Sequence, residues 1–339
     1  MRVHIAVSSI VLCLLALPAF AQDAVEPTTG AEQTRPTSAA ADIPYAEPMP
    51  LLEVADDPEA ARSIGGPDPS IFGTTRYYAD GRVETFTPSD ELLAEIHDTR
   101  AEISDLPEAI DRNIIGADSR VRIEDATRYP FRAVGYIFAE WASGKRSACS
   151  GTLIGKSTVL TAGHCLWAPD WGGRPVLVDF YPGANAPNKM PYGVYHYASF
   201  DVFSGFIETY NQAYYNNTAM QTDMAIITLS APAGGANGTF GYRIDMDDDF
   251  DAHILGYPGD KPSMTLWRAD CTIPLSRKFP NYLMHECDAW PGMSGAGVYW
   301  VDPEGRRYLR GIFVGVSVSV NYALRINPLY MQWIKERTY

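Results

Sequence analysis

Short apolar runs alternate with turn-forming residues along the chain from residue 114 to the C-terminus. The runs are rich in β-branched and aromatic side chains, and clusters of Gly, Pro, Asn and Asp separate them. Regularly spaced short runs with turn signals between them are typical of an all-β barrel or sandwich. The pattern predicts strands at Ala133–Phe138, Gly151–Ile154, Val159–Thr161, Val176–Tyr181, Ala225–Leu229, Ala252–Leu255, Gly297–Val301 and Arg310–Val320.

A helical pattern follows the last predicted strand, at Pro328–Glu336. Leu329, Trp333 and Ile334 recur at spacings that place them on one side of a helix. The sequence therefore predicts an all-β domain that ends in a C-terminal helix.

Residues 1–21 have the pattern of a secretory signal peptide. A basic start precedes an apolar stretch, and a small-x-small ending predicts cleavage before Gln22. No later segment approaches the roughly 20 continuous apolar residues of a membrane-spanning helix. We expect a secreted protein, extracellular or periplasmic, without a membrane anchor.

Residues 22–112 carry most of the negative charge, with 20 Asp and Glu against 6 Lys and Arg, whereas residues 113–339 have 21 against 20. Residues 22–70 are rich in Pro, Ala and Thr and poor in aromatic residues, a composition that favours disorder. Further on, Ser89 is suited to cap a helix that has Leu92 and Ile96 on one face. We interpret residues 22–112 as an acidic, largely disordered propeptide, with a flexible surface tail as the alternative.

Four cysteines lie outside the leader: Cys149, Cys165, Cys271 and Cys287. An even number in an exported chain favours two disulfides, and the absence of any C-x-x-C pair argues against a zinc site. The sequence allows three pairings. The sequential pairing closes two short loops, and we expect this one.

Three short stretches hold residue types suited to nucleophilic catalysis: His164 within Thr161–Cys165, Asp223 before an apolar run, and Ser294 within Gly292–Gly297. A serine hydroxyl is a poor nucleophile at neutral pH and needs an adjacent base. An imidazole can take its proton and return it, and a carboxylate orients the imidazole. The chain order His, Asp, Ser is that of chymotrypsin-type enzymes.

Each of these residues alone has a plainer interpretation. A histidine after a β-rich run is more often structural, glycine-flanked serines are common in loops, and acidic residues often begin strands. Their occurrence together, in this order and each at the edge of an apolar segment, favours a catalytic triad. Asp201 and Asp179 are rivals for the acidic position, but the apolar run after Asp223 is suited to bury its carboxylate against the imidazole.

The region from residue 113 to 339 resembles the trypsin-like superfamily, and within it the bacterial glutamyl endopeptidase branch. A second set of stretches resembles the animal serine protease 23 type. The first set is Asn113–Arg120, Tyr129–Ala133, Thr161–Cys165, Gly256–Lys261 and Gly292–Gly297, and the second is Glu286–Tyr299 and Ala323–Leu329.

The resemblance implies two antiparallel six-stranded β-barrels with the triad in the cleft between them. It implies that Cys149–Cys165 is the bridge beside the catalytic histidine. It also assigns the oxyanion hole to the backbone N–H groups of Gly292 and Ser294.

Activation is expected to differ from trypsin. In trypsin-like digestive enzymes the new N-terminal amine pairs with an Asp immediately before the catalytic serine, and here that position is Met293. The bond Arg112–Asn113 aligns with the processing junction of the glutamyl branch, and a basic residue before the junction suits a trypsin-like activator. We expect a zymogen processed at this bond.

The specificity pocket has four candidate residues, Asp288, Ala289, Phe313 and Val316. Asp288 falls where trypsin places the carboxylate that attracts Arg and Lys, but glutamyl relatives also have Asp there. Phe313 stands where the glutamyl enzymes have a pocket histidine, and Val316 replaces a glycine that keeps the trypsin pocket open. The sequence does not determine which substrate side chain the pocket prefers.

We expect polypeptide substrates, an activating protease that cleaves after Arg112, a monomer, and no cofactor, metal ion or nucleic-acid partner. The acidic turn at Asp245–Asp251 has carboxylates for calcium but lacks the glycine and terminal Glu of a calcium loop, so we interpret it as a solvated loop. Two other functions stay open: a catalytically inactive trypsin-fold binding module, and an esterase that uses the same triad.

Overall fold

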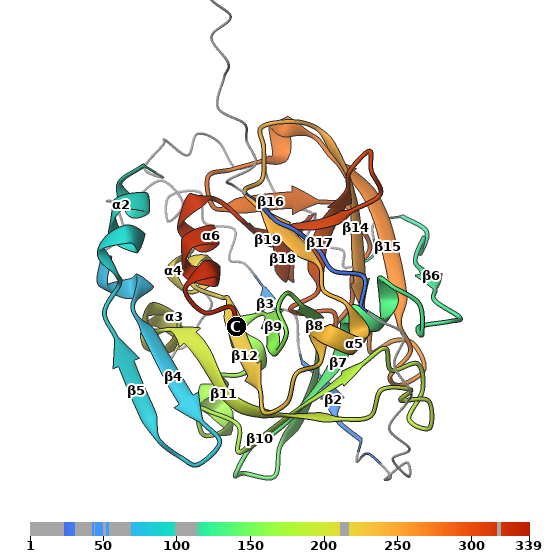
Figure 1. Cartoon of the computed structure of the whole chain (residues 1–339), viewed down its shortest axis with the longest axis horizontal. Helices are drawn as coiled ribbons and strands as arrows, with labels where there is room; N and C mark the ends of the chain where they lie inside the picture. The colour runs from blue at the N-terminus through green and yellow to red at the C-terminus, as the bar shows by residue number, and fades with distance from the viewer. Residues whose placement is uncertain are drawn as a thin grey trace, which may run out of the picture.

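Antiparallel strands form two curved sheets in the computed structural model, which describes residues 24–30, 43, 45–49, 52–53, 69–98, 114, 116–210, 217–316 and 320–339. The predicted signal peptide and the junction Arg112–Asn113 lie outside the described residues. Figure 1 shows the two sheets side by side, with the C-terminal helix α6 (Pro328–Lys335) packed at one edge. The predicted all-β, two-barrel class and its C-terminal helix are confirmed.

Six strands of the first sheet close into a barrel, because β10 pairs with both β7 and β11. In order around the barrel they are β10 (Leu177–Pro182), β7 (Val134–Glu140), β8 (Arg146–Leu153), β9 (Thr158–Thr161), β12 (Ala225–Leu229) and β11 (Tyr195–Phe203).

The second sheet is built around β18, which pairs with β17 and β19. Its main strands are β13 (Gly241–Arg243), β18 (Arg307–Val316), β17 (Gly297–Val301), β14 (Phe250–Gly256), β15 (Trp267–Ile273), β6 (Val121–Arg122), β19 (Asn321–Arg325) and β16 (Tyr282–His285). A separate apolar cluster fills this barrel.

Short helices connect or flank the strands. The α-helices are α2 (Asp90–Asp98), α3 (Ser204–Tyr210), α4 (Asn217–Gln221), α5 (Gly234–Asn237) and α6. The 3-10 turns are η2 (Pro69–Phe72), η3 (Phe131–Ala133), η4 (Gly163–Cys165), η5 (Pro169–Trp171) and η6 (Leu275–Arg277).

Both disulfides have the sequential pairing that we expected. Cys149 on β8 is joined to Cys165 in η4, and Cys271 on β15 is joined to Cys287 just after β16. Each bridge spans a sequence separation of 16 residues. In the chain-entropy model a loop of this size is stabilised by about 3 kcal/mol.

Part of the acidic N-terminal region is built into the first barrel. Strands β4 (Thr74–Tyr78) and β5 (Val83–Phe86) form a hairpin, and β4 pairs with β11. On this hairpin Arg76 donates two hydrogen bonds to Asp201, at 2.6 and 2.7 Å.

Helix α2 follows the hairpin and packs on α6. The Ser89 hydroxyl accepts from the Leu92 amide at 3.0 Å, which confirms the predicted cap. Leu92 and Ile96 are buried as predicted, so residues 69–98 dock on the barrel.

Three shorter stretches of residues 22–70 also pair with the domain. Strand β1 (Ala24–Val25) pairs with β13, β2 (Glu47–Pro48) with β8, and β3 (Leu52–Glu53) with β18. The expectation of disorder therefore does not hold for these stretches.

Several strands were missed by the apolar pattern, among them β11, β15, β16 and β19. Strand β15 reads Trp-Arg-Ala-Asp-Cys-Thr-Ile, with polar residues on the face that lies away from the barrel interior. Alternating strands of this kind lack the continuous apolar run on which our prediction depended.

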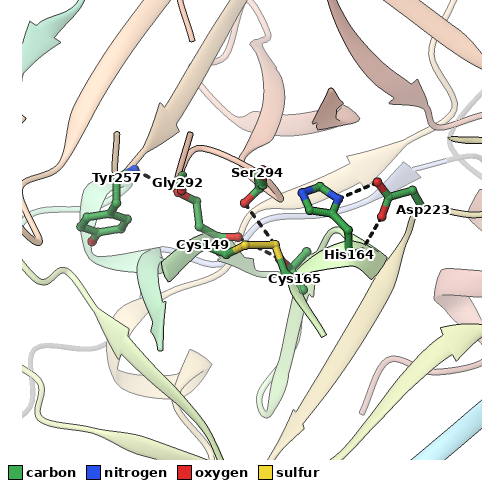
Figure 2. Close-up of a disulfide and its surroundings, with 9 residues drawn as sticks. Cys149, His164, Cys165, Asp223, Tyr257, Gly292 and Ser294 are labelled. Carbon is green, nitrogen blue, oxygen red and sulfur yellow. Dashed lines mark hydrogen bonds and ion pairs between the residues drawn. A yellow bond between two sulfur atoms is a disulfide. The ribbon is translucent and has the colours of Figure 1, made fainter. Parts of the chain in front are cut away.

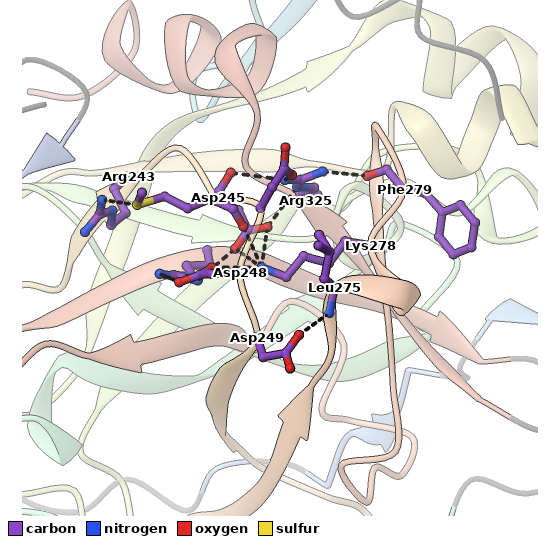
Figure 3. A network of polar contacts seen from close by, with 11 residues as sticks. Arg243, Asp245, Asp248, Asp249, Leu275, Lys278, Phe279 and Arg325 are labelled. Atoms are coloured by element: carbon purple, nitrogen blue, oxygen red, sulfur yellow. Dashed lines mark hydrogen bonds and ion pairs between the residues drawn. The ribbon is translucent and has the colours of Figure 1, made fainter.

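In the acidic turn after β13, Asp245 belongs to a buried charge network, which corrects the interpretation as a solvated loop at this residue, whereas Asp247 and Asp249 are exposed (Figure 3). Asp245 is 4 % exposed, and it accepts from Lys278, Arg310 and Arg325 at 3.0, 3.3 and 2.8 Å. Burial raises the pKa of Asp245 and lowers the pKa of Lys278, and each partner opposes these shifts.

Replacing Asp245 by Asn is expected to destabilise the fold, because Lys278 and Arg310 stay buried without this anion. Breaking one side of a buried ion pair costs about 3–5 kcal/mol, and at this chain size we expect a Tm lower by roughly 6–15 °C. The matched control is Asp247→Asn in the same turn, because the Asp247 side chain is 75 % exposed and also pairs with Arg325. Calorimetry that found equal Tm losses in both variants would contradict the role given to Asp245.

Candidate active site

The register of two strands brings His164 and Asp223 together. Strands β9 and β12 pair antiparallel with Thr161 opposite Ala225. His164 lies three residues after Thr161, and Asp223 lies two residues before Ala225. His164 and Asp223 therefore lie at the same end of the strand pair.

Two hydrogen bonds join these residues. The His164 amide donates to Asp223 Oδ1 at 2.8 Å, and His164 Nδ1 lies 2.6 Å from Asp223 Oδ2. A carboxylate at this distance favours the tautomer with the proton on Nδ1, which leaves a lone pair on Nε2. Gly163 permits this approach, because a Cβ there would meet Asp223 Oδ1 at 3.0 Å.

Ser294 lies on a tight turn held between the two barrels (Figure 2). From β8, the Ser150 amide donates to the Ser294 carbonyl and the Ser150 hydroxyl to the Gly292 carbonyl, both at 2.9 Å. From β18, the Phe313 carbonyl accepts from the Gly295 amide at 2.8 Å. One strand of each barrel thus positions the nucleophile.

Two glycines in this turn have a backbone that other residues rarely adopt. Gly292 has φ +97° and Gly295 has φ +80°. A Cβ on Gly295 would come within 2.1 Å of Thr161 Oγ1, at the end of β9. The glycine pattern around Ser294 is therefore needed to bring the turn against the first barrel.

Ser294 and His164 face each other in Figure 2. The Ser294 carbonyl lies 3.6 Å from Cys165 Sγ, next to His164 in the chain. Within the described part of the chain, Ser294 Oγ and His164 Nε2 are buried and have no hydrogen-bond partner. Catalytic serine–histidine bonds are often long in the free enzyme and shorten when a substrate binds.

The Gly292 amide, one of the two predicted oxyanion donors, already has a hydrogen-bond partner in the structure. The Gly292 amide donates to the carbonyl oxygen of Met49 at 3.1 Å. Met49 belongs to the N-terminal region, and our reading of the sequence gave it no role. A backbone carbonyl carries no sequence signal, although the prolines on both sides of Met49 indicate an extended segment.

The rival acidic residues lie elsewhere. Asp201 is held by Arg76, as described above, and Asp179 Oδ1 lies 2.7 Å from Nδ1 of His196. The structure brings only Asp223 of these three to His164 among the residues that it describes.

All four residues named for the specificity pocket are buried. Ala289, Phe313 and Val316 belong to the apolar cluster of the second barrel, together with Met293. Asp288 accepts from the Ser119 amide at 2.7 Å and from the Ser119 hydroxyl at 2.6 Å. Its carboxylate thus anchors the segment just after the predicted processing junction.

His285 is a buried residue that our sequence interpretation passed over. Its ring packs against Phe313 with centroids 5.7 Å apart, and burial lowers its pKa to about 3. It lies close to Cys271 and Cys287, but their sulfurs are joined in a disulfide and offer no thiolate to a metal ion. In the described residues, no helix is long and apolar enough to cross a membrane.

Part of the chain matches a family of known proteins. A family model for the trypsin-like peptidase domain matches residues 149–308, a range that includes His164, Asp223 and Ser294. Glutamyl endopeptidase of Bacillus licheniformis is 32% identical over 190 residues, which are 56% of this chain and 55% of that protein. Serine protease 23 of Bos taurus is 30% identical over 270 residues, covering 66% of each chain.

The chain thus spans a little over half the length of the bacterial relative and just under two thirds of the mammalian one. A solved structure of a Glu endopeptidase in complex with MPD matches with a TM-score of 0.56 and 23% identity, over 66% of this chain and 98% of that chain. At this sequence identity the match shows a similar fold only.

Proposed function

Because this chain belongs to the trypsin-like serine peptidases, we propose that it is a secreted endopeptidase that cleaves polypeptides through Ser294, His164 and Asp223. The observation that supports this most is the buried 2.6 Å contact between His164 Nδ1 and Asp223. It leaves His164 Nε2 as the base, on the side where Ser294 lies.

In the proposed reaction, Ser294 Oγ attacks the scissile carbonyl while His164 Nε2 takes the hydroxyl proton. Asp223 holds the imidazole in place and stabilises its charged form. The amides of Gly292 and Ser294 would hold the negative oxygen of the tetrahedral intermediate, and loss of one such donor typically costs about 10²–10³ in rate.

His164 then gives its proton to the leaving amine, and an acyl-enzyme on Ser294 remains. Water attacks the acyl group with His164 again as the base, which releases the second product and restores the serine.

We further propose that the protein is exported and made as a zymogen. Two disulfides and the signal-like leader support export. The acidic region before residue 113 and the basic residue at Arg112 support processing by a trypsin-like protease.

A fluorophosphonate probe tests the proposal on protein that trypsin has processed and from which the propeptide has been removed. We expect covalent labelling of Ser294, located by peptide mass mapping, together with hydrolysis of unfolded polypeptides. The control is Ser294→Ala, which should show neither.

The other outcomes select the other functions. No labelling of the folded, processed protein would favour a binding module. Labelling with turnover of simple esters but no peptide cleavage would favour an esterase.

A further inference from the structure

An N-terminal segment, described at residues 46–49 and 52–53, pairs with a strand of each barrel near the Ser294 turn. Its β2 part pairs in parallel with β8, Glu47 opposite Ser147 and Pro48 opposite Ala148. Its β3 part pairs in parallel with β18, Leu52 opposite Gly315 and Glu53 opposite Val316. Figure 1 shows β3 near the middle of the molecule and β2 lower in the view, beside β7.

Met49 lies between these two pairings. Its amide donates to the Ala148 carbonyl at 2.8 Å, and its carbonyl accepts from the Gly292 amide at 3.1 Å. Its side chain is only 5 % exposed. The segment is therefore held by backbone hydrogen bonds and by burial at one residue.

The sequence of this segment favours an extended backbone. Prolines at positions 48 and 50 disfavour helical backbone at the residue before each of them, which is Glu47 and Met49 respectively. A chain that is already restricted loses less conformational entropy on docking.

The domain is shaped to accept Pro48. A Cβ on Gly259 would come within 2.0 Å of Pro48 Cγ, and a Cβ on Gly292 would come within 3.4 Å of Pro48 Cβ. The proline ring thus lies directly on the backbone beside the oxyanion donor.

We propose that residues 46–49 are a built-in inhibitor, in which the Met49 carbonyl occupies the Gly292 oxyanion donor. This inference rests on the proposed function. One N–H group makes one strong hydrogen bond, so a substrate carbonyl cannot use Gly292 until Met49 leaves. The inhibitor therefore competes for the group that stabilises the transition state.

Cleavage after Arg112 does not by itself remove this inhibitor. The segment is joined through the chain to residues 69–98, which dock on β11 and α6 through the Arg76–Asp201 pair and the contact of Ser89 with Glu336. Such a tether keeps the effective concentration of the segment high at the cleft. Full activation thus requires release or destruction of the docked propeptide.

The test uses the full, unprocessed chain with Met49→Asp, which places a carboxylate at a buried position. We expect fluorophosphonate labelling of Ser294 to become about tenfold faster or more than in the wild-type chain. The matched control is Tyr45→Asp, since Tyr45 lies just before this segment and is 73 % exposed. Its labelling rate should stay within about twofold of wild type.

A synthetic peptide of residues 44–53 gives a second measurement that does not depend on the folding of one variant. Added to the Met49→Asp chain, it should slow labelling again, and fluorescence anisotropy should show that it binds. The same peptide with Met49→Asp should do neither. Added to wild-type chain from which trypsin treatment and gel filtration have removed the propeptide, the unchanged peptide should also slow labelling.

The outcomes separate this inference from the proposed function. Equal labelling rates in wild type and Met49→Asp, with no effect of the peptide, would overturn the inhibitor. Binding of the peptide without labelling in any form of the chain would support the docking site but refute the peptidase.

Discussion

Ser294→Ala is expected to lower kcat of the processed protein on a peptide substrate by about a million-fold, and His164→Ala by a similar factor. The double variant should be hardly slower than either single one, because nucleophile and base act as one unit. Asp223→Asn should cost about 10⁴-fold, since the imidazole then loses the partner that fixes its tautomer. Initial rates on one peptide measure all four variants, and unchanged Tm values would show that the fold is intact.

The chain offers a matched control in a second Asp–His pair. Asp179 and His196 make a contact of 2.7 Å, close to the 2.6 Å of the triad pair, but the His196 side chain is 62 % exposed and lies on β11. Asp179→Asn should leave kcat within a few-fold of wild type. The triad assignment would be wrong if this variant lost as much activity as Asp223→Asn, or if the Ser294/His164 double variant fell far below both singles.

The second large effect is expected at the predicted processing bond. Arg112→Gln should give a longer secreted product. Its activity should be lower than that of the processed wild-type protein by about two orders of magnitude or more, because the uncleaved N-terminal region then stays docked on the domain. Trypsin treatment followed by removal of the released propeptide should activate the wild-type chain, with a new N-terminus that reads Asn-Ile-Ile-Gly, but should not activate the variant. Casein hydrolysis before and after trypsin, with N-terminal sequencing, measures both results.

Arg100→Gln is the control for this experiment, since it removes another arginine from the same acidic region. It should be processed and activated as wild type. Full activity of the uncleaved Arg112→Gln chain would show that residues 22–112 are a tail, and the zymogen proposal would have to be given up.

Local patterns in the sequence were enough to predict the class of fold. Apolar runs between turn residues indicated strands β9 and β17, which lie just before His164 and just after Ser294, because a strand with a continuous apolar run is recognised from its own residues. The cap at Ser89 and the helix after Pro328 were predicted for the same reason: their signals lie within a few residues of the structure that they form.

Contacts between distant parts of the chain required the folded structure. Asp179 and Asp201 have the same chemistry as Asp223, and only the pairing of β9 with β12 shows which carboxylate meets His164. Likewise, Asp288 looked like a free pocket carboxylate until the fold placed Ser119 on it. The acidic turn gave no sign that three basic side chains from later in the chain, Lys278, Arg310 and Arg325, surround Asp245.

The occupied oxyanion donor is furthest from what a sequence can reveal. Met49 and Gly292 meet through a carbonyl and an amide that every residue except proline also has, so no residue type marks the contact. Side-chain chemistry and short-range periodicity are written in the order of residues, and they specified a serine peptidase domain. Which backbone groups meet across more than two hundred residues depends on how the strands pair, and that arrangement places the N-terminal segment against the catalytic turn.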